Sequence, residues 1–221
     1  MDTGPLLLSF QIAVVATLVA GVVGLFVASL LASFRFRGRE IVDVLFSAPL
    51  VLPPTVLGYF LLVAIGRKST IGHAYEALTG SSIVFTKAGA VCAAAVGALP
   101  FVVRFARSAL EGVDPVYVQA ARTLGATPLR AFFRVQLPLA KRGIIAALTL
   151  AFARSLGDFG ITLMVAGNIP GETRTAALAI YDAIQAQRES DARAMVLVLT
   201  ATALSALYVV GKLLRARESE S

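Results

Sequence analysis

The sequence predicts an all-α, polytopic integral membrane protein with five transmembrane helices. Hydrophobic residues make up 57% of the chain and charged residues 15%, whereas soluble domains average about 45–50% and about 25%. The apolar residues gather in five stretches, each long enough for the ~20 residues that cross a bilayer as a helix. A soluble core could not hold so many long apolar runs, so we expect one transmembrane domain over residues 1–221.

The five predicted helices follow one another along the chain. They cover residues 9–33, 44–66, 84–106, 143–166 and 194–213. We expect the first to be a permanent span rather than a cleaved signal peptide, because it lacks a basic start and its apolar run is too long. The last residues, from about 215 to 221, are polar and charged and predict a disordered tail.

Basic residues are concentrated on one side of the predicted membrane. The connections after the first, third and fifth helices share that side and hold most of the 20 Lys and Arg. They are Arg35, Arg37, Arg39, Arg104, Arg107, Arg122, Arg130, Arg134, Lys141, Arg142, Lys212, Arg215 and Arg217. The positive-inside rule therefore predicts an N-terminus outside the cell and a C-terminus in the cytoplasm. The net charge of +7 then reflects topology rather than nucleic-acid binding, with a loop lying on anionic lipid as the alternative.

The loop between the third and fourth helices, residues 107–142, carries the most specific pattern in the chain. Asp114 followed by proline is typical of an N-cap and first helical turn, and Gly125 is typical of the residue that ends a helix. Thr127 followed by proline repeats the start pattern, and we expect Pro138 to close this second short helix. The loop is therefore predicted to form two short helices on the cytoplasmic side.

These residues resemble the cytoplasmic EAA loop of bacterial ABC importer permeases. That pattern is Glu-Ala-Ala, three residues, Gly, nine residues and Ile-x-Leu-Pro, and it is matched in register by Gln119, Ala120, Ala121, Gly125, Val135, Leu137 and Pro138. The resemblance implies a type I ABC importer permease of the MetI-like fold, whose loop inserts into a cleft of the ATPase subunit. Tyr117 and Leu124 would be apolar anchors there, and Arg122 and Arg130 would meet acidic rims. Gln119 keeps a hydrogen-bonding amide but removes the charge of the family's Glu. A hairpin that merely connects two spans is the alternative.

Two further segments look like the molybdate permeases of the molybdate, sulfate and tungstate group. They are residues 48–59, which open the second helix, and residues 152–171, which occupy the fourth helix and its outer exit. This resemblance implies a permease of the bacterial inner membrane that translocates molybdate. It would work as a homodimer with two copies of an ABC ATPase subunit, and a periplasmic or lipid-anchored molybdate-binding protein would deliver the anion. The chain itself would perform no chemistry and bind no cofactor, with ATP and magnesium on the ATPase partner. Sulfate or tungstate is the closest alternative substrate.

Two places within the predicted spans are candidates for lining the translocation pathway. The tandem prolines of the second span remove two backbone donors and expose carbonyl groups that need a water-lined or protein-buried setting. Arg154 and Asp158 lie four residues apart in the fourth span and can neutralise each other. An ordinary kink and a structural ion pair are the respective alternatives. The pathway or gate candidates are Pro53, Pro54, Thr55, Arg154, Ser155 and Asp158.

Functions of other classes make different demands on the sequence. An ATP-independent secondary transporter or channel would leave the basic loop unexplained and predicts inverted repeats or more intramembrane ion ligands. A membrane enzyme would need clustered His, Asp or Cys, whereas the chain has one cysteine, Cys92, and one histidine, His73. The outer loop at residues 169–175 is either a contact for the binding protein or a plain solvated turn.

Overall fold

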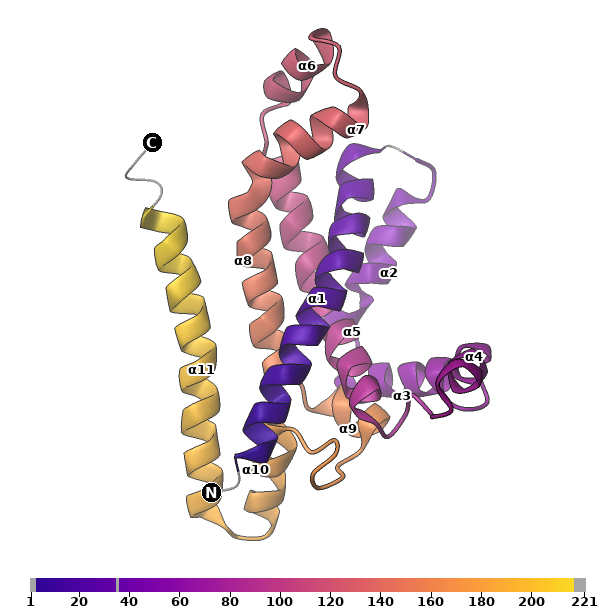
Figure 1. Ribbon diagram of the computed structural model, residues 1–221, viewed down its shortest axis with the longest axis vertical. Helices are drawn as coiled ribbons and strands as arrows, with labels where there is room; N and C mark the ends of the chain where they lie inside the picture. Colours follow the sequence, from indigo (N-terminus) through magenta and orange to yellow (C-terminus); the bar gives the residue numbers. More distant parts are fainter. Residues whose placement is uncertain (1–2, 35, 217–221) are drawn as a thin grey trace.

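The computed structural model describes residues 3–34 and 36–216, whose regular structure is entirely helical. Three long helices, α1 (Gly4–Ser33), α5 (Lys87–Glu111) and α8 (Leu137–Leu156), pack together as the centre of the molecule (Figure 1). A fourth, α11 (Glu189–Ala216), lies at the edge against α8 and against α10 (Ala176–Gln185). The predicted all-α fold is confirmed.

The centre of the bundle is built largely from small residues, which let helix backbones approach closely. A Cβ on Gly24 of α1 would lie 2.7 Å from the Val102 side chain of α5, and one on Gly21 would lie 2.9 Å from Leu148 of α8. The buried alanines of this core are Ala16, Ala20, Ala28, Ala90, Ala94, Ala95, Ala98, Ala106, Ala140, Ala147, Ala151 and Ala166. Close backbone contact therefore holds α1, α5 and α8 together.

Four stretches within the described residues are long and apolar enough to cross a membrane: Gly4–Ser33, Lys87–Glu111, Pro128–Leu156 and Glu189–Lys212. They correspond to the first, third, fourth and fifth predicted spans. The second predicted span, 44–66, is not one continuous helix. It is divided into α2 (Arg39–Val51) and α3 (Pro54–Ile65), each too short to cross a bilayer alone.

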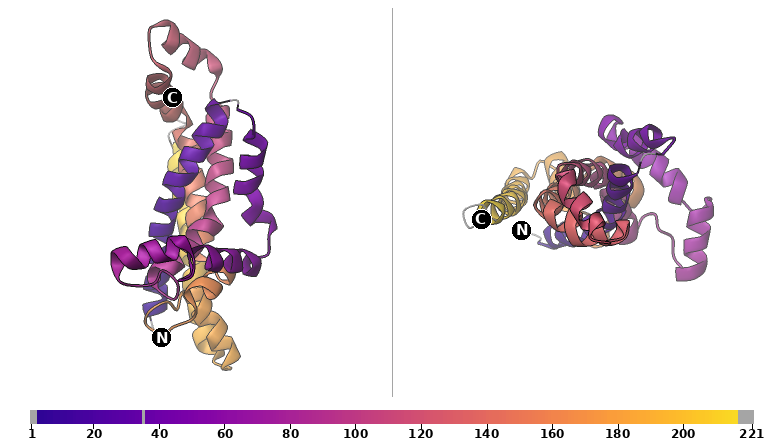
Figure 2. Two further views of the ribbon diagram at one scale, coloured as in Figure 1. Left: turned by 90° about the vertical axis from the view of Figure 1, so that its right-hand side faces the viewer. Right: turned by 90° about the horizontal axis from the view of Figure 1, so that it is seen from above.

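The division of the second span has the cause expected from its sequence. The backbone N–H of Leu52 makes the last hydrogen bond of α2, 3.0 Å to Ala48, and the two prolines that follow have no N–H to continue the ladder. α2 runs beside α1, whereas α3 turns across the bundle and leads out to α4 (Thr70–Thr79) (Figures 1 and 2). The predicted helix break is confirmed.

The fourth span differs from the prediction at both ends. Helical structure starts at α7 (Pro128–Ala131), passes through a π-helical turn, η1 (Phe132–Gln136), and continues into α8. The expectation that Pro138 closes a short helix is therefore wrong. The N–H of Leu137 bonds to the carbonyl of Phe132, five residues back, and the wider turn accommodates a proline without ending the helix. At its other end α8 stops at Leu156, and a separate short helix, α9 (Gly160–Ala166), follows.

The connections between helices are divided between the two ends of the molecule in the way that the charge pattern predicts. Helix α6 (Pro115–Thr123), the start of α2 and the final turns of α11 lie at one end, and α10 with the first turn of α1 lies at the other (Figure 1). The three basic connections thus share one end. Residues 215 and 216 belong to α11, and residues 217–221 of the predicted tail lie outside the described residues.

Candidate functional site

The first candidate site is the helical projection at the basic end, formed by α6 and the turn after it (Figure 1). Asp114 Oδ1 accepts a 2.9 Å hydrogen bond from the N–H of Val116 and caps the helix, as predicted. Gly125 has φ +87°, a conformation that costs glycine little. The N–H of Gly125 bonds to Arg122 and that of Ala126 bonds to Ala121, both at 3.0 Å, which is the Schellman arrangement. The predicted start and end of this helix are confirmed.

The surface of α6 is open, and none of its residues is buried. Val116 is 62% exposed, Tyr117 57% and the following Leu124 88%. Gln119, Ala120 and Arg122 are also exposed, and Ala121 is half-buried. A projecting helix with bare apolar side chains at an end rich in arginine is a surface suited to a protein partner.

The second half of the matched motif lies in a different place. Leu137 is half-buried against the central core and Pro138 is exposed, both at the start of α8 rather than in the projection. Gln136 Nε2 donates a 3.2 Å hydrogen bond to the carbonyl of Leu110 near the end of α5. This bond joins the two roots of the projection, at the end of α5 and the start of α8.

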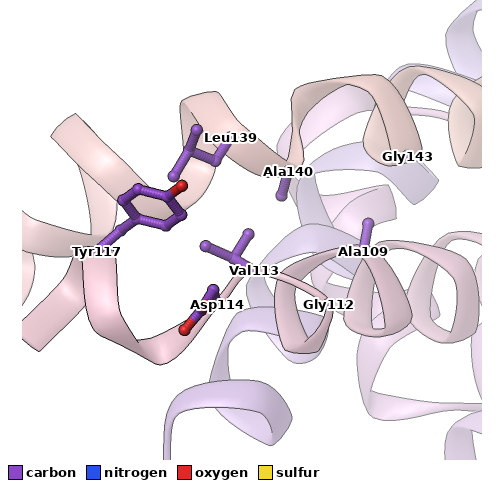
Figure 3. Close-up of a pocket in the computed structure, with 8 residues that line it drawn as sticks. All are labelled: Ala109, Gly112, Val113, Asp114, Tyr117, Leu139, Ala140 and Gly143. Atoms are coloured by element: carbon purple, nitrogen blue, oxygen red, sulfur yellow. The ribbon is translucent and has the colours of Figure 1, made fainter.

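A hollow of about 430 Å³ separates the projection from these roots. Tyr117 and Leu139 point toward one another across it, and Val113 lies on its floor (Figure 3). Its other walls come from the end of α5 and the start of α8, at Ala109 and Gly143. The hollow leaves α6 unsupported by the bundle on this side.

The second candidate site lies where two broken helices meet. A Cβ on Gly160, the first residue of α9, would come within 2.8 Å of Pro54 Cβ at the start of α3. One turn further, a Cβ on Gly58 would come within 2.6 Å of Met164. The break at 52–54 and the break at 157–159 are therefore in direct contact. Pro53, Pro54 and Thr55 remain exposed.

Arg154 and Asp158 form the predicted ion pair across the break between α8 and α9. Arg154 Nη1 lies 2.9 Å from Asp158 Oδ1. The other oxygen, Oδ2, accepts bonds from the N–H of Thr162 at 3.0 Å and from its hydroxyl at 2.6 Å. Ser155 is buried, and its hydroxyl donates to the carbonyl of Ala94 on α5 at 3.4 Å. In this arrangement Ser155 faces α5 rather than an open surface of the chain.

Two further residues of this site were not identified from the sequence. Gly97 of α5 lies beneath the ion pair, since a Cβ there would be 3.4 Å from Arg154 Nη2 and 3.5 Å from Asp158 Oδ1. Nothing in the sequence around Gly97 distinguishes it from other glycines in the same apolar run. Thr162 follows Asp158 by four residues, and this spacing could have predicted the contact between the two side chains.

A cluster of ion pairs joins α2 to α5 at the basic end. Glu111 Oε1 accepts hydrogen bonds from both Arg39 and Arg107 at 2.9 Å. Arg107 also lies 3.1 Å from Asp43. The charges are partly exposed, so each pair adds only about 0–1 kcal/mol to stability. Their effect is mainly to fix the start of α2 beside the helix that leads into the projection.

At the opposite end, the loop between α9 and α10 is ordered by its own polar contacts. Arg174 bonds to Asn168 Oδ1 at 3.0 Å and to Asp182 Oδ2 at 2.9 Å. Asn168 Nδ2 in turn donates to Asp182 Oδ1 at 2.8 Å. Pro170, Gly171 and Glu172 stay exposed at the tip.

Comparison with known proteins gives consistent results. Residues 20–217 match the protein family described as binding-protein-dependent transport system inner membrane component. The chain is 46% identical to the molybdenum transport system permease protein ModB of Escherichia coli K12, over 92% of this chain and 89% of that protein. It is 37% identical to a putative molybdenum transport system permease of Bacillus subtilis, over 93% and 91%. The sulfate transport system permease CysT of Salmonella typhimurium is 36% identical, over 91% and 72%.

Solved structures share the fold at low sequence identity. An inward-facing MetNI methionine ABC transporter superposes with a TM-score of 0.75 at 19% identity, covering 96% of this chain and 94% of that one. A bacterial alginate ABC transporter in complex with its periplasmic protein gives 0.68 at 14% identity, covering 95% and 75%. The predicted MetI-like fold is confirmed.

Proposed function

Because the chain belongs to the family of binding-protein-dependent transport system inner membrane components, we propose that it is the transmembrane permease subunit of an ATP-driven importer for molybdate. The observation that carries this proposal is the 46% identity to a molybdenum permease over 92% of the chain. The fold adds the two parts that such a subunit needs, a projection for a partner and a pair of broken helices inside the membrane. ATP and magnesium would be bound by the partner ATPase.

Molybdate is proposed over sulfate on the strength of the nearer relatives. Identity to the Escherichia coli molybdenum permease exceeds identity to the sulfate permease by ten points, 46% against 36%. The Bacillus subtilis relative, at 37%, exceeds the sulfate permease, at 36%, by a single point. Substrate choice therefore needs a competition assay among molybdate, tungstate and sulfate.

The projection around α6 is the proposed docking element for the ATPase. Its anchors would be Tyr117 and Leu124, with the small residues Ala120 and Ala121 allowing close approach. Gln119 and Arg122 would supply polar contacts, and Gly125 would end the helix. Leu137 and Pro138, at the root, would pass the movement of the docked ATPase to α8. Docking of the ATPase at α6 would require an orientation with α6 and the C-terminus in the cytoplasm and the N-terminus outside.

The broken helices are evidence for the proposed second copy of this chain and for the proposed pathway between the two copies. Irregular backbone is not tolerated against lipid, because unpaired carbonyl groups have no partner there. The exposed segment Pro53, Pro54 and Thr55 therefore needs protein or a water-filled path beside it. We assign this segment, together with Arg154, Ser155 and Asp158, to the pathway or its gate. Two permease copies, two ATPase subunits and an outer binding protein, contacting the loop at 169–175, would complete the importer.

Reconstitution tests the proposal. Vesicles carrying this chain, its ATPase and its binding protein should accumulate labelled molybdate when ATP is supplied to the ATPase. Excess unlabelled tungstate or sulfate should reduce the uptake of labelled molybdate only if that anion is also a substrate. Accumulation with the ATPase absent would instead identify a secondary transporter or channel.

A matched pair of glycine variants tests the docking element. Gly125→Asp should release the ATPase during co-purification while leaving the membrane part folded. Gly80→Asp is the control, because Gly80 has a similar backbone angle, φ +71° against +87°, and also has nothing within 4 Å of a built Cβ. It lies after α4, far from α6 along the chain. Loss of the ATPase in both variants, or in neither, would contradict docking through α6.

A further inference from the structure

The ion pair at the break between α8 and α9 is asymmetric. Both oxygens of Asp158 are engaged, one by Arg154 and the other by the N–H and hydroxyl of Thr162. The Asp158 side chain is only 2% exposed, whereas the Arg154 side chain is 31% exposed. The carboxylate is therefore fixed, and the guanidinium is the partner that is free to make another contact.

Arg154 has hydrogen-bond donors left over. Its Nη1 bonds to Asp158, while Nε and Nη2 donate to no residue within the described part of the chain. The buried side-chain nitrogens and oxygens that lack a partner there are Arg39 Nε and Ser82 Oγ, so the spare donors of Arg154 are not sealed in the protein. A planar guanidinium with adjacent free donors matches the spacing of two oxygens on one tetrahedral oxyanion.

The pair lies deep in the membrane part of the fold. It sits against Gly97, which is ten residues from the start of α5 at Lys87 and fourteen from its end at Glu111. At 1.5 Å per residue these separations are about 15 Å and about 21 Å, and the hydrocarbon core is about 30 Å thick. The free donors thus open near the bilayer centre, beside the two helix breaks.

We propose that Arg154 is a transient contact for a tetrahedral dianionic oxyanion during its passage, and that Asp158, held by Thr162, is the fixed counter-charge that keeps this contact weak. The inference rests on the proposed import function and names a binding group within it. An arginine without a counter-charge at this depth would retain a dianion. The fixed carboxylate repels the anion and favours its departure once the passage has opened.

Two measurements on the whole importer test the proposal, the first in lipid nanodiscs and the second in lipid vesicles. The first is equilibrium binding of labelled sodium molybdate in the absence of the binding protein. The second is the maximal rate of ATP-driven uptake with saturating loaded binding protein, after reconstitution into vesicles. Asp158→Asn keeps the size of the side chain and one accepting oxygen for Thr162, removes the charge, and replaces the oxygen that accepts from Arg154 with an amide NH2. We expect it to tighten molybdate binding on the order of tenfold or more and to slow uptake by a similar factor.

Removing the arginine separates an anion contact from a structural ion pair. Arg154→Gln should abolish the binding measured without the binding protein and should lower uptake strongly. The double variant Arg154→Gln/Asp158→Asn leaves no orphan charge, so a purely structural pair predicts recovered uptake. We expect the double variant to purify with its ATPase, yet to stay deficient in both binding and uptake. Arg154→Lys, which keeps the charge without the planar fork, should be intermediate.

The outcomes distinguish this inference from the proposed function. Near wild-type uptake by the double variant would overturn the role of Arg154, and so would Asp158→Asn with unchanged binding and uptake. If the wild-type importer takes up none of the three oxyanions, the proposed function fails instead. Gel filtration of each variant with its ATPase verifies assembly before either measurement.

Discussion

The contact between α3 and α9 predicts the effect of one added methyl group. In Gly160→Ala the new Cβ would lie 2.8 Å from Pro54 Cβ, which is held rigidly by its ring. Carbon atoms in contact normally lie about 3.5–4.0 Å apart, so the two helices must separate by about 1 Å. Such overpacking costs about 1–3 kcal/mol, and alanine in place of glycine in a helix returns about 0.5–1 kcal/mol. We expect a net loss of roughly 0.5–2 kcal/mol.

A glycine three residues earlier provides the matched control. A Cβ on Gly157 would meet only the carbonyl oxygen of Ala153, at 3.9 Å. Its φ of −97° suits alanine, so Gly157→Ala should be neutral or more stable by up to about 1 kcal/mol. The two variants make the same chemical change, yet the expected effects have opposite signs.

Thermal unfolding measured with a thiol-reactive dye checks this prediction, since the single cysteine, Cys92, is half-buried in α5. For a chain of this size each 1 kcal/mol changes the midpoint by about 2–4 °C. Gly160→Ala should unfold several degrees below Gly157→Ala and should also reduce uptake. Equal midpoints for the two variants would refute the packing of α3 on α9 through Gly160.

Three other variants test contacts around the projection. Asp114→Ala removes the cap on the N–H of Val116 and should weaken α6 by about 0.5–2 kcal/mol, measured as a lower affinity for the ATPase. Gln136→Ala removes the bond to the Leu110 carbonyl and should cost about 0.5–1.5 kcal/mol, measured as faster hydrogen–deuterium exchange at residues 110–114. Glu111→Gln breaks two partly exposed ion pairs and should lower the free energy of unfolding by less than about 2 kcal/mol, measured by chemical denaturation in micelles; a larger loss would mean that the cluster is more buried than its exposure indicates.

Local patterns were sufficient to predict the projection. The caps at Asp114 and Thr127 and the end at Gly125 depend on bonds between residues two to five apart, so the sequence contains both partners. The same reasoning failed at Pro138, because a π-helical turn precedes it and removes the usual reason for a helix to stop. A prediction from proline alone assumes regular helix geometry upstream.

Contacts between distant segments could not be predicted in the same way. The helix break at the tandem prolines was predicted, but its contact with Gly160 joins segments about a hundred residues apart. The Arg154–Asp158 pair was predicted from its spacing, but its contact with Gly97 was not. The residues around a glycine do not indicate whether another helix packs against it. The pathway candidates were thus identified one by one, and the fold brings Pro54 of one group against Gly160, two residues after Asp158 of the other.

The alanine-rich centre has a consequence for how strain travels through the molecule. An alanine side chain has no alternative rotamer, so a core of alanines cannot reshape itself to absorb a push. A tilt imposed on α5 and α8 at the ends nearest α6 must therefore be taken up elsewhere in the molecule. Helical hydrogen bonding is interrupted at 52–54 and at 157–159, on the side of the bundle away from α6. Movement of α8 would therefore be taken up in part at the break that follows it, beside the arginine that contacts Gly97.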